Sequence, residues 1–518
     1  MSRDKMLEML AEVEQQRSRY QMGGGPKAIE NQHKKGKLTA RERINLLFDP
    51  GTFQEFGLWA TPFRTGFDID EKFSPTDAVV TGYGKVDGRT VMAYAHDFTV
   101  LTGGQSGGQH AKIVRVIDNA VKMGVPYVGM VDSSGVRLHD GMGEPGVKPP
   151  ADGIGLHDTG SFMWSPPYAS GVIPQVALML GPMFAGSSYS PIMKDFLVMN
   201  AHTSSACLAS PPAIKQVTGQ DVTINELGGP KVHSEISGIC DKVVQSDEES
   251  IEYCKKLLSY WPSNWRETPP IVDMGDSPYR TDERLIDIVP DDLTQGYDMR
   301  QLIAMLVDCG EYVETKEVYA PSVITCFARI GGRSVGIVAS NPAVNLGALD
   351  MNTSDKAARF IRFSDAFNIP LVFLADTVGY SSDAKKQTMG LERHAAKVMF
   401  AISEATVPKI TINIRNCANY GELAFGNEQL GSDLVLAWPY TQLGKINDLE
   451  QYYSRTKDPE KIQAYLDKFN TLYNAGERLL YSDIIDPRNT RRSIFDALVW
   501  MENKREERPW KKHGNIPL

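Results

Sequence analysis

Two stretches of the chain are versions of one another: Gly124-Val-Pro-Tyr-Val-Gly-Met-Val-Asp-Ser-Ser-Gly135 and Asn368-Ile-Pro-Leu-Val-Phe-Leu-Ala-Asp-Thr-Val-Gly379. They lie 244 residues apart (368 minus 124). Gly84-Lys-Val-Asp-Gly-Arg89 matches Ala328-Arg-Ile-Gly-Gly-Arg333 at the same separation. Self-similarity at one long offset indicates two copies of a single structural unit.

Each copy alternates an apolar strand pattern with an amphipathic helix pattern. In the first copy, a predicted helix over Ala111–Met123 precedes a predicted strand over Tyr127–Val131. Its apolar residues recur at helical spacing: Ile113, Val116, Ile117 and Val121. Repeated strand-helix-strand units predict an α/β fold with parallel sheets covered by helices, and with ligands at the carboxyl ends of the strands.

The length and the repeat together predict two domains. A chain of 518 residues with 42% apolar content is too long for one ordinary core. We expect lobes at 1–265 and 266–518, with Pro262–Pro270 as the linker. Val172–Leu180 matches Thr406–Ile414 at an offset of only 234, so the first copy holds ten more residues (244 minus 234), within Gly141–Ser170. That Gly- and Pro-rich segment, with Trp164, is interpreted as a long loop over a functional face.

Composition excludes several classes of function. The 55 basic residues are outnumbered by 64 acidic ones, and a net charge of -9 argues against nucleic-acid binding. The six cysteines lack metal-ligand spacing, so we expect reduced thiols and no metal site. No apolar run is long enough for a membrane span, and the first residues lack the apolar core of a signal peptide. We expect a cytoplasmic protein without direct membrane insertion.

Small-residue turns follow two of the predicted strands. Asp132-Ser-Ser-Gly135 follows the first, and Gly181-Pro-Met-Phe-Ala-Gly186 follows the next, before a predicted helix. Turns that open a helix present unpaired N–H groups, which can stabilise a thioester enolate oxygen, although such turns also serve tight packing alone. Arg137 either pairs with a phosphate of coenzyme A or is a surface arginine without a partner.

Hydrolase and nucleotide-binding motifs are missing from the sequence. The Gly-rich stretch Asp97–Gly108 lacks the Gly-Lys-Ser/Thr ending of a P-loop, so it is interpreted as a backbone turn near the acyl chain or coenzyme A. No Gly-x-Ser-x-Gly elbow is present, and no histidine is marked by spacing as a base. Met193-Lys194 is not part of a Met-Lys-Met motif, so we expect no covalently carried prosthetic group on this chain.

Longer motifs resemble the carboxyltransferase subunits of biotin-dependent acyl-CoA carboxylases and decarboxylases, including the propionyl-CoA carboxylase β and methylmalonyl-CoA decarboxylase α subunits. The resemblance covers nearly the whole chain. The motifs that carry it are Gly36–Phe53, Asp97-Phe-Thr-Val, Ser170-Gly-Val-Ile-Pro-Gln175, Tyr189-Ser-Pro191, Glu226-Leu-Gly-Gly229, Ala358–Pro370 and Trp510–Leu518.

The resemblance implies two tandem crotonase-like lobes, with the acyl-CoA on lobe 1–265 and biotin on lobe 266–518. The implied reaction moves a carboxyl group between carboxybiotin on a separate carrier and the α-carbon of a coenzyme A thioester, through an enolate held by backbone oxyanion holes. Implied partners are a biotin carboxyl carrier protein and a biotin carboxylase subunit. The implied assembly is a homo-oligomer, a dimer or hexamer, in which lobes of different subunits face one another.

The same resemblance assigns the site residues by position. In the first lobe, the oxyanion donors would be the amides of Ala185 and Gly186, with a negative φ required at Ala185. The biotin side would include Gly379 and either an Asn419–Tyr420 pair, by gapless counting, or Asn419-Tyr-Gly421 preceded by Ala418. Residues implied to contact coenzyme A or the acyl group are Ser134, Gly135, Arg137 and Tyr189.

Three alternatives to a carboxylase subunit stay open. The same lobes could serve a biotin-dependent carboxyacyl-CoA decarboxylase. The replaced glycines near Asn419, and Leu443–Asn447 in place of the usual run, leave open a biotin-independent crotonase-type acyl-CoA enzyme. A non-catalytic assembly subunit is the remaining alternative.

Overall fold

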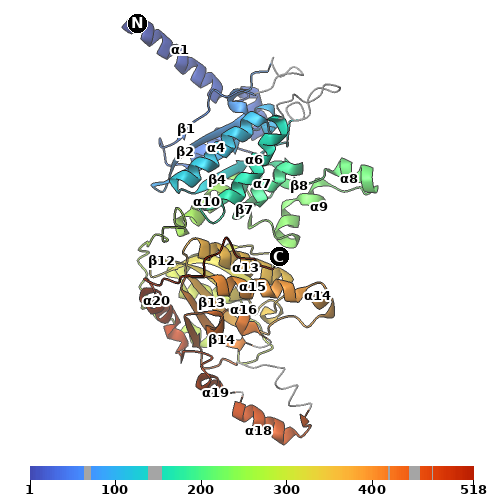
Figure 1. The fold of residues 1–518 in the computed structure, drawn as a ribbon, viewed down its shortest axis with the longest axis vertical. Coiled ribbons are helices and arrows are strands. Elements are labelled where there is room, and N and C mark those ends of the chain that lie inside the picture. Colours follow the sequence, from blue (N-terminus) through green and yellow to red (C-terminus); the bar gives the residue numbers. More distant parts are fainter. Residues whose placement is uncertain (63–71, 138–153, 418–419, 443–454, 470, 518) are drawn as a thin grey trace. The chain divides into compact units, whose positions relative to one another are not determined.

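The computed structural model describes the chain except residues 63–71, 138–153, 418–419, 443–454, 470 and 518. Its residues form two compact units (Figure 1). The N-terminal lobe comprises Met1–Ser259 with Ser263–Trp265, and the C-terminal lobe comprises Tyr260–Pro262 with Arg266–Leu518. Among the described residues, no helix has the length and apolar character needed to cross a lipid bilayer.

The N-terminal lobe is built on a mixed seven-stranded sheet. The first three strands pair antiparallel and the remaining pairs are parallel. In spatial order the strands are β1 (Gln54–Glu55), β2 (Val79–Val86), β3 (Arg89–His96), β4 (Tyr127–Val131), β5 (Gln175–Met179), β7 (Phe196–Asn200) and β9 (Lys242–Val244). A small separate sheet pairs β6 (Pro182–Phe184) with β8 (Ser205–Cys207).

The C-terminal lobe repeats this topology. Its sheet again begins with antiparallel pairs and continues with parallel ones. In spatial order the strands are β10 (Tyr312–Thr315), β11 (Val323–Ile330), β12 (Arg333–Ser340), β13 (Leu371–Thr377), β14 (Lys409–Cys417), β15 (Leu434–Ala437) and β16 (Asp483–Ile484). The 244-residue sequence repeat therefore corresponds to a repeat of strand order and direction.

The antiparallel edge of each sheet corrects the expectation of purely parallel sheets. β2 and β3 form a hairpin whose two loop residues, Asp87 (φ 49°) and Gly88 (φ 77°), are left-handed. Gly331 (φ 59°) and Gly332 (φ 77°) close the β11–β12 hairpin in the same way. Two left-handed residues are what a tight two-residue hairpin loop requires, and Asp-Gly or Gly-Gly provides them.

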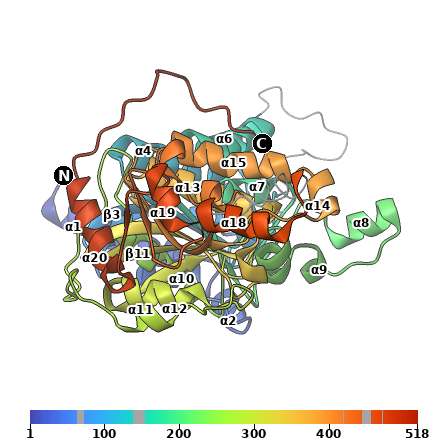
Figure 2. The same ribbon diagram turned by 90° about the horizontal axis from the view of Figure 1, so that it is seen from below.

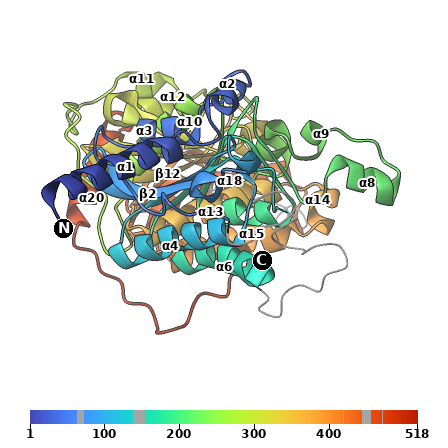
Figure 3. The ribbon, with the colours of Figure 1, turned by 90° about the horizontal axis from the view of Figure 1, so that it is seen from above.

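Two long helices pack side by side on each sheet. In the N-terminal lobe these are α4 (Gly107–Met123) and α6 (Ile154–Ala169) (Figure 3). In the C-terminal lobe they are α13 (Met351–Ala366) and α15 (Leu391–Glu404) (Figure 2). The predicted apolar face of α4 is confirmed, because Ile113, Val116 and Ile117 are fully buried.

Helix α6 overturns the prediction of a long loop for the part of Gly141–Ser170 that the structure describes. Its Phe162 is fully buried and stacks on His110 of α4, with ring centroids 4.7 Å apart. Trp164 is 57% exposed and stacks on Tyr168. Packing of one apolar face stabilises the helix although its composition includes Pro166-Pro167, since tertiary contacts outweigh local propensity.

Further helices complete both lobes. Those of the N-terminal part are α1 (Arg3–Gln21), α2 (Pro26–His33), α3 (Ala40–Leu47), α7 (Tyr189–Ile192), α8 (Pro211–Thr218), α9 (Ile224–Gly228) and α10 (Asp247–Tyr260). Those of the C-terminal part are α11 (Arg284–Asp287), α12 (Met299–Leu306), α14 (Ala384–Thr388), α16 (Gly421–Ala424), α18 (Pro459–Phe469), α19 (Leu472–Glu477) and α20 (Thr490–Trp500). Helices α1 and α8 bury none of their side chains and project from the N-terminal lobe (Figure 1).

Candidate functional site

Two turns meet at the carboxyl ends of β4 and β5 in the N-terminal lobe. Gly135, after β4, has φ 102°, and a Cβ built on it would lie 3.6 Å from the Phe184 carbonyl oxygen. A 3₁₀ turn begins at Ala185, directly after Phe184. The N–H groups of Ala185 and Gly186 open this turn and therefore have no acceptor within it. The structure thus brings together three of the sequence-predicted site residues.

The backbone of Ala185 differs from the expectation. Its φ is +55°, whereas the sequence argument required a negative value. A left-handed residue at the start of a helical turn directs successive N–H groups into one concavity, which suits an anionic oxygen. The strain of this conformation in an alanine is about 1–2 kcal/mol. The N–H is retained, so the requirement for negative φ was wrong.

Serine hydroxyls brace the turn from within. Ser187 Oγ donates to the Phe184 carbonyl (2.6 Å) and Ser188 Oγ to the Ala185 carbonyl (2.8 Å), and both serines are buried. Tyr189 begins α7 immediately afterwards and is 41% exposed. The turn is therefore held by its own side chains and leads to an accessible aromatic ring.

The other predicted contact residue of the first turn, Ser134, is fixed by the Gly-rich stretch. Ser134 Oγ lies 2.7 Å from Thr102 Oγ1, and the Ser134 N–H donates to the Thr102 carbonyl. Gly103 has φ 63°, and a Cβ there would collide with the Asp132 carbonyl oxygen. The stretch Asp97–Gly108 thus positions the turn after β4 by close backbone contact.

The C-terminal lobe repeats the arrangement. Gly379 (φ 84°) follows β13, and Tyr420 (φ 61°) is left-handed directly before Gly421, which begins α16. A Cβ on Gly421 would lie 3.4 Å from Gly379 Cα. Tyr420–Gly421 therefore corresponds to Ala185–Gly186.

This correspondence favours the second of the two sequence alignments for the biotin-side turn. The gapless count had placed the pair one residue earlier, on Asn419 and Tyr420. Ala418, Asn419 and Leu443–Asn447 lie outside the described residues. The glycine required for close approach stands at Gly421, and the Tyr420 side chain is 46% exposed.

A buried ion network anchors the end of β4, and the sequence had not indicated it. Asp132 is fully buried and accepts from Lys37 Nζ (2.5 Å), Arg43 (3.0 Å) and Gln32 Nε2 (3.0 Å). Arg43 also pairs with the buried Asp247 at 2.7 Å. Burial lowers the pKa of Lys37 against the opposing effect of Asp132, while the pKa of Arg43 is raised because the two carboxylates outweigh its burial.

The equivalent carboxylate of the C-terminal lobe uses a different cation. Asp376 pairs with Arg415 Nε at 3.0 Å and accepts the Asn416 N–H at 3.1 Å. Burial raises the pKa of Asp376, and Arg415 opposes the shift. The 244-residue repeat pairs Asp132 with Asp376, but the arginine partner comes from α3 in one lobe (Arg43) and from β14 in the other (Arg415).

Arg137 does not take one of its two predicted forms. Its guanidinium is buried and pairs with Asp77 at 2.7 Å, so the expectation of a surface arginine without a partner was wrong. Asp77 also accepts from Ser106 Oγ at 2.6 Å. An arginine already paired internally stabilises the segment after Gly135, and a direct contact with a coenzyme A phosphate stays a prediction.

Lys194 lies where a biotin attachment residue could not function. Its side chain is 1% exposed, with Nζ near the rings of Tyr94 and Tyr127. Burial lowers its pKa to about 7. This environment agrees with the sequence argument that biotin arrives on another protein.

Comparisons with known proteins agree with this geometry. The family model described as "Carboxyl transferase domain" matches residues 31–516. The methylmalonyl-CoA decarboxylase subunit alpha of Veillonella parvula is 42% identical over 506 residues, covering 97% of each chain. The methylmalonyl-CoA carboxyltransferase 12S subunit of Propionibacterium freudenreichii subsp. shermanii is 42% identical over 525 residues, covering 99% of this chain and 97% of the relative.

A solved structure of a transcarboxylase 12S hexamer, with methylmalonyl-coenzyme A and methylmalonic acid bound, superposes with a TM-score of 0.93. It is 41% identical and covers 100% of both chains. The family resemblance and the tandem crotonase-like α/β fold predicted from the sequence are confirmed.

Proposed function

The chain belongs to the carboxyl transferase domain family, and from that premise we propose that it moves a carboxyl group between biotin on a separate carrier protein and the α-carbon of an acyl-CoA thioester. The observation that carries this proposal is the duplicated turn. Each lobe has a left-handed residue before a glycine at the start of a helical turn, next to a left-handed glycine from the neighbouring strand. Two such turns match a reaction with two carbonyl oxygens to stabilise.

The N-terminal turn has the features of the acyl-CoA half-site. The N–H groups of Ala185 and Gly186 would hold the thioester oxygen as it gains charge in the enolate, and each such donor contributes about 3–4 kcal/mol in enzymes. Met163 of α6 stands beside this turn, with its Cε 3.3 Å from a Cβ built on Gly186. Its apolar side chain would exclude water from the enolate. Ser134, Gly135 and Tyr189 would border the acyl group.

The turn at Tyr420–Gly421 in the C-terminal lobe has the features of a site for the ureido carbonyl of biotin. Biotin supplies the carboxyl group on its ureido nitrogen, or accepts it there. Tyr420 and Gly421 would donate their N–H groups to the ureido oxygen, since both open α16. A Cβ on Gly421 would collide with Thr377 Cγ2 at 2.5 Å, so the glycine lets α16 begin directly against the end of β13. Residues 1–265 would thus bind the acyl-CoA and residues 266–518 biotin.

The proposal also covers the oligomeric state of the chain, its partner proteins and the direction of carboxyl transfer. The transcarboxylase relative forms a hexamer, and we propose a homo-oligomer for this chain as well. A biotin carrier protein would be an obligatory partner. One relative is a decarboxylase subunit and another a carboxyltransferase subunit, so the partners would set the direction of transfer. A biotin carboxylase partner would drive carboxylation.

Turnover of a panel of acyl-CoAs and carboxyacyl-CoAs by the purified protein tests the proposal, with and without a biotin carrier. Transfer that requires the carrier and is blocked by avidin is the expected result. Turnover that is insensitive to avidin would instead identify a biotin-independent crotonase-type enzyme. Absence of any turnover with carrier present would leave only an assembly role.

A further inference from the structure

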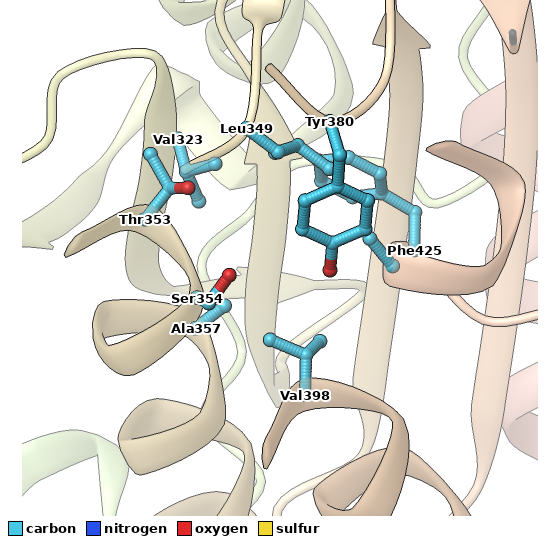
Figure 4. Close-up of a pocket in the computed structure, with 9 residues that line it drawn as sticks. Val323, Leu349, Thr353, Ser354, Ala357, Tyr380, Val398 and Phe425 are labelled. Carbon is cyan, nitrogen blue, oxygen red and sulfur yellow. The ribbon is translucent and has the colours of Figure 1, made fainter. Parts of the chain in front are cut away.

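Helix α1 leaves a row of apolar side chains open to solvent. None of its residues is buried, and the exposed fractions of its large apolar side chains lie between 45% and 56%: Met6, Leu7, Met9, Leu10 and Val13. The pocket in Figure 4 shows the opposite case, because Tyr380, Val398 and Phe425 close around a volume of about 10 Å³, room for one water molecule. An apolar surface left open on one helix indicates a contact with another molecule.

The base of α1 is fixed to the N-terminal lobe. The Tyr20 ring meets Trp59 and Phe73 edge-on, with ring centroids 5.1 and 5.0 Å apart. Just after the helix, the Gly24 N–H donates to Thr99 Oγ1 at 3.0 Å, and a Cβ on Gly24 would collide with the Thr99 carbonyl oxygen. The 19 residues of α1 span about 28 Å at 1.5 Å per residue, so the helix is an arm held at one end (Figure 1).

One stripe along α1 is complementary to itself. It consists of Arg3, Leu7, Leu10 and Glu14, at alternating spacings of four and three residues, and all four are exposed. This spacing is that of the seam between two helices in a coiled coil. When two copies of the helix lie antiparallel with Leu7 opposite Leu10, Arg3 is opposite Glu14, since each pair of numbers adds to 17. Apolar residues then form the centre of the contact, with an ion pair at each end.

This register uses only the part of α1 that projects from the lobe. Ser2 of one helix would lie opposite Gln15 of the other (17 minus 2), and Gln15 precedes the anchored Tyr20 by five residues. Met6 and Val13 flank the stripe on one side, so Met6 of one helix would contact Val13 of the other. The antiparallel pair would thus cover four of the five exposed apolar side chains, all except Met9.

The charges of α1 favour a second copy over a lipid surface. The helix carries four acidic and four basic side chains, so its net charge is zero: Asp4, Glu8, Glu12, Glu14, Arg3, Lys5, Arg17 and Arg19. Helices that bind anionic membrane surfaces are rich in lysine and arginine. Glu14 pairs with Arg17 within the helix at 3.5 Å, but both side chains are exposed, and such a pair contributes little. Glu14 can therefore pair with Arg3 of another chain.

We propose that α1 pairs antiparallel with α1 of a second copy of this chain, with Leu7 and Leu10 at the centre of the contact and Arg3 bound to Glu14 at both ends. The pairing rests on the homo-oligomer of the proposed function and names one surface that joins its copies. The contact is isologous, because each helix contributes the same residues. Two paired helix segments bury less area than a stable interface requires by itself, about 1,200 Å², so the pairing acts together with other contacts of the homo-oligomer.

Disulfide trapping in the full-length protein tests the register. The double variant Arg3→Cys/Glu14→Cys places a thiol at each end of the stripe. Eleven residues of helix separate the two positions by about 16 Å, beyond the Cα separation of about 4.4–6.8 Å in a disulfide, so a bond between them joins two chains. Mild oxidation should give a covalent dimer on a non-reducing gel, whereas each single variant and the wild type should run as single chains.

Charge reversal with a matched control provides a second measurement, by sedimentation velocity. Arg3→Glu and Glu14→Arg each place like charges opposite one another, so the homo-oligomer should dissociate on dilution at an about two- to tenfold higher concentration. The double variant Arg3→Glu/Glu14→Arg restores opposite charges and should dissociate like the wild type. Glu12→Arg changes the net charge as much as Glu14→Arg but lies on the opposite face of α1, so it should also match the wild type. Circular dichroism checks that each variant is folded.

The results separate the pairing from the proposed reaction. A covalent dimer in Arg3→Cys alone, or none in the double cysteine variant, would overturn the antiparallel contact, as would wild-type dissociation of both charge reversals. Phosphatidylglycerol vesicles that bind the wild type but not Leu7→Glu, with no cross-link, would instead assign α1 to a membrane surface. A monomeric wild type would overturn the homo-oligomer and the pairing together, whereas avidin-insensitive turnover would overturn only the proposed reaction.

Discussion

Lys112 and Lys356 stand 244 residues apart in the chain and occupy one position in the two lobes, each donating to two main-chain carbonyls. Lys112 Nζ contacts the carbonyls of Thr76 (2.7 Å) and Val79 (2.5 Å). Lys356 Nζ contacts those of Lys316 (2.8 Å) and Tyr319 (2.9 Å). Both lysines are buried, so Lys112 fastens the chain entering its sheet to α4, and Lys356 does the same for α13.

These lysines predict a rise in stability with pH. Burial lowers the pKa of Lys356 to about 7 and that of Lys112 to about 8, against 10.5 for an exposed lysine. Between the lowered pKa of each lysine and 10.5, the unfolded chain binds more protons than the folded protein. The free energy of unfolding therefore rises with pH in this range. Relative to Lys356→Met, the wild type should gain about 1.4 kcal/mol per pH unit from pH 7.5 to 10.

Unfolding free energies of both proteins at several pH values in this window measure the gain. Lys122→Met, an exposed substitution on α4, should show a constant difference from the wild type. A flat profile for Lys356→Met would contradict the burial argument.

The buried ring of His96 should make the folded protein less stable in acid. Its ring is buried, its Nδ1 accepts the Asp132 N–H at 3.4 Å, and burial lowers its pKa to about 3. As pH falls from 6.5 towards 3, His96 becomes protonated in the unfolded chain but stays neutral in the folded protein. Stability attributable to His96 should therefore fall by about 1.4 kcal/mol per pH unit.

The variant His96→Gln keeps an acceptor for the Asp132 N–H but does not titrate. It should lose less stability than the wild type between pH 6 and 4, as measured by denaturant unfolding at each pH. Parallel losses in the two proteins would show that His96 does not carry the effect.

Ala185 predicts opposite effects of glycine and proline on turnover. Ala185→Gly removes the strain at φ 55° and keeps the N–H, so activity should be retained. Ala185→Pro cannot adopt a positive φ and has no N–H, so kcat should fall by about 10²–10³-fold, the effect of one oxyanion donor. Steady-state kinetics, with melting temperature as a folding control, separates the two. Equal activity of both variants would remove Ala185 from the site.

Replacing the buried Asp132 carboxylate by an amide should lower the stability of the protein strongly. Asp132→Asn leaves Lys37 and Arg43 without the carboxylate that compensates them, so the lobe should lose about 3–5 kcal/mol of stability. Asp221→Asn breaks only the exposed pair with Lys215 and should cost less than about 1 kcal/mol. Thermal unfolding of both variants provides the comparison. Similar losses in the two would indicate that the network is not coupled to folding.

Local patterns in the sequence were sufficient for one central strand and one long helix of the N-terminal lobe. The strand Tyr127–Val131 and the apolar face of α4 were predicted from periodicity, because a continuous burial pattern is encoded residue by residue. The antiparallel hairpins were missed although Asp87-Gly88 and Gly331-Gly332 signalled them. Helix α6 was missed because Gly and Pro outweighed Phe162, whose buried partner lies on another helix.

The residues of the candidate site also differ in whether a local sequence signal marked them. Gly135, Gly186 and Gly379 could be marked from sequence because small residues after a strand are a local signal. The buried lysines had only a faint signal, a cation beside Ile113 on an apolar helix face. Asp77 had none, since its partner Arg137 lies 60 residues away.

The sequence by itself determined the duplicated α/β fold, because each copy retains its own pattern of strands and helices, and its long motifs carried the resemblance to carboxyltransferase subunits. Only the tertiary structure decided that Tyr420–Gly421 is the counterpart of Ala185–Gly186 and that Lys37 and Arg43 neutralise Asp132. Backbone dihedrals and buried charge pairs depend on residues far apart in the chain. Their free energies arise from burial and close contact, which exist only once the lobes have folded.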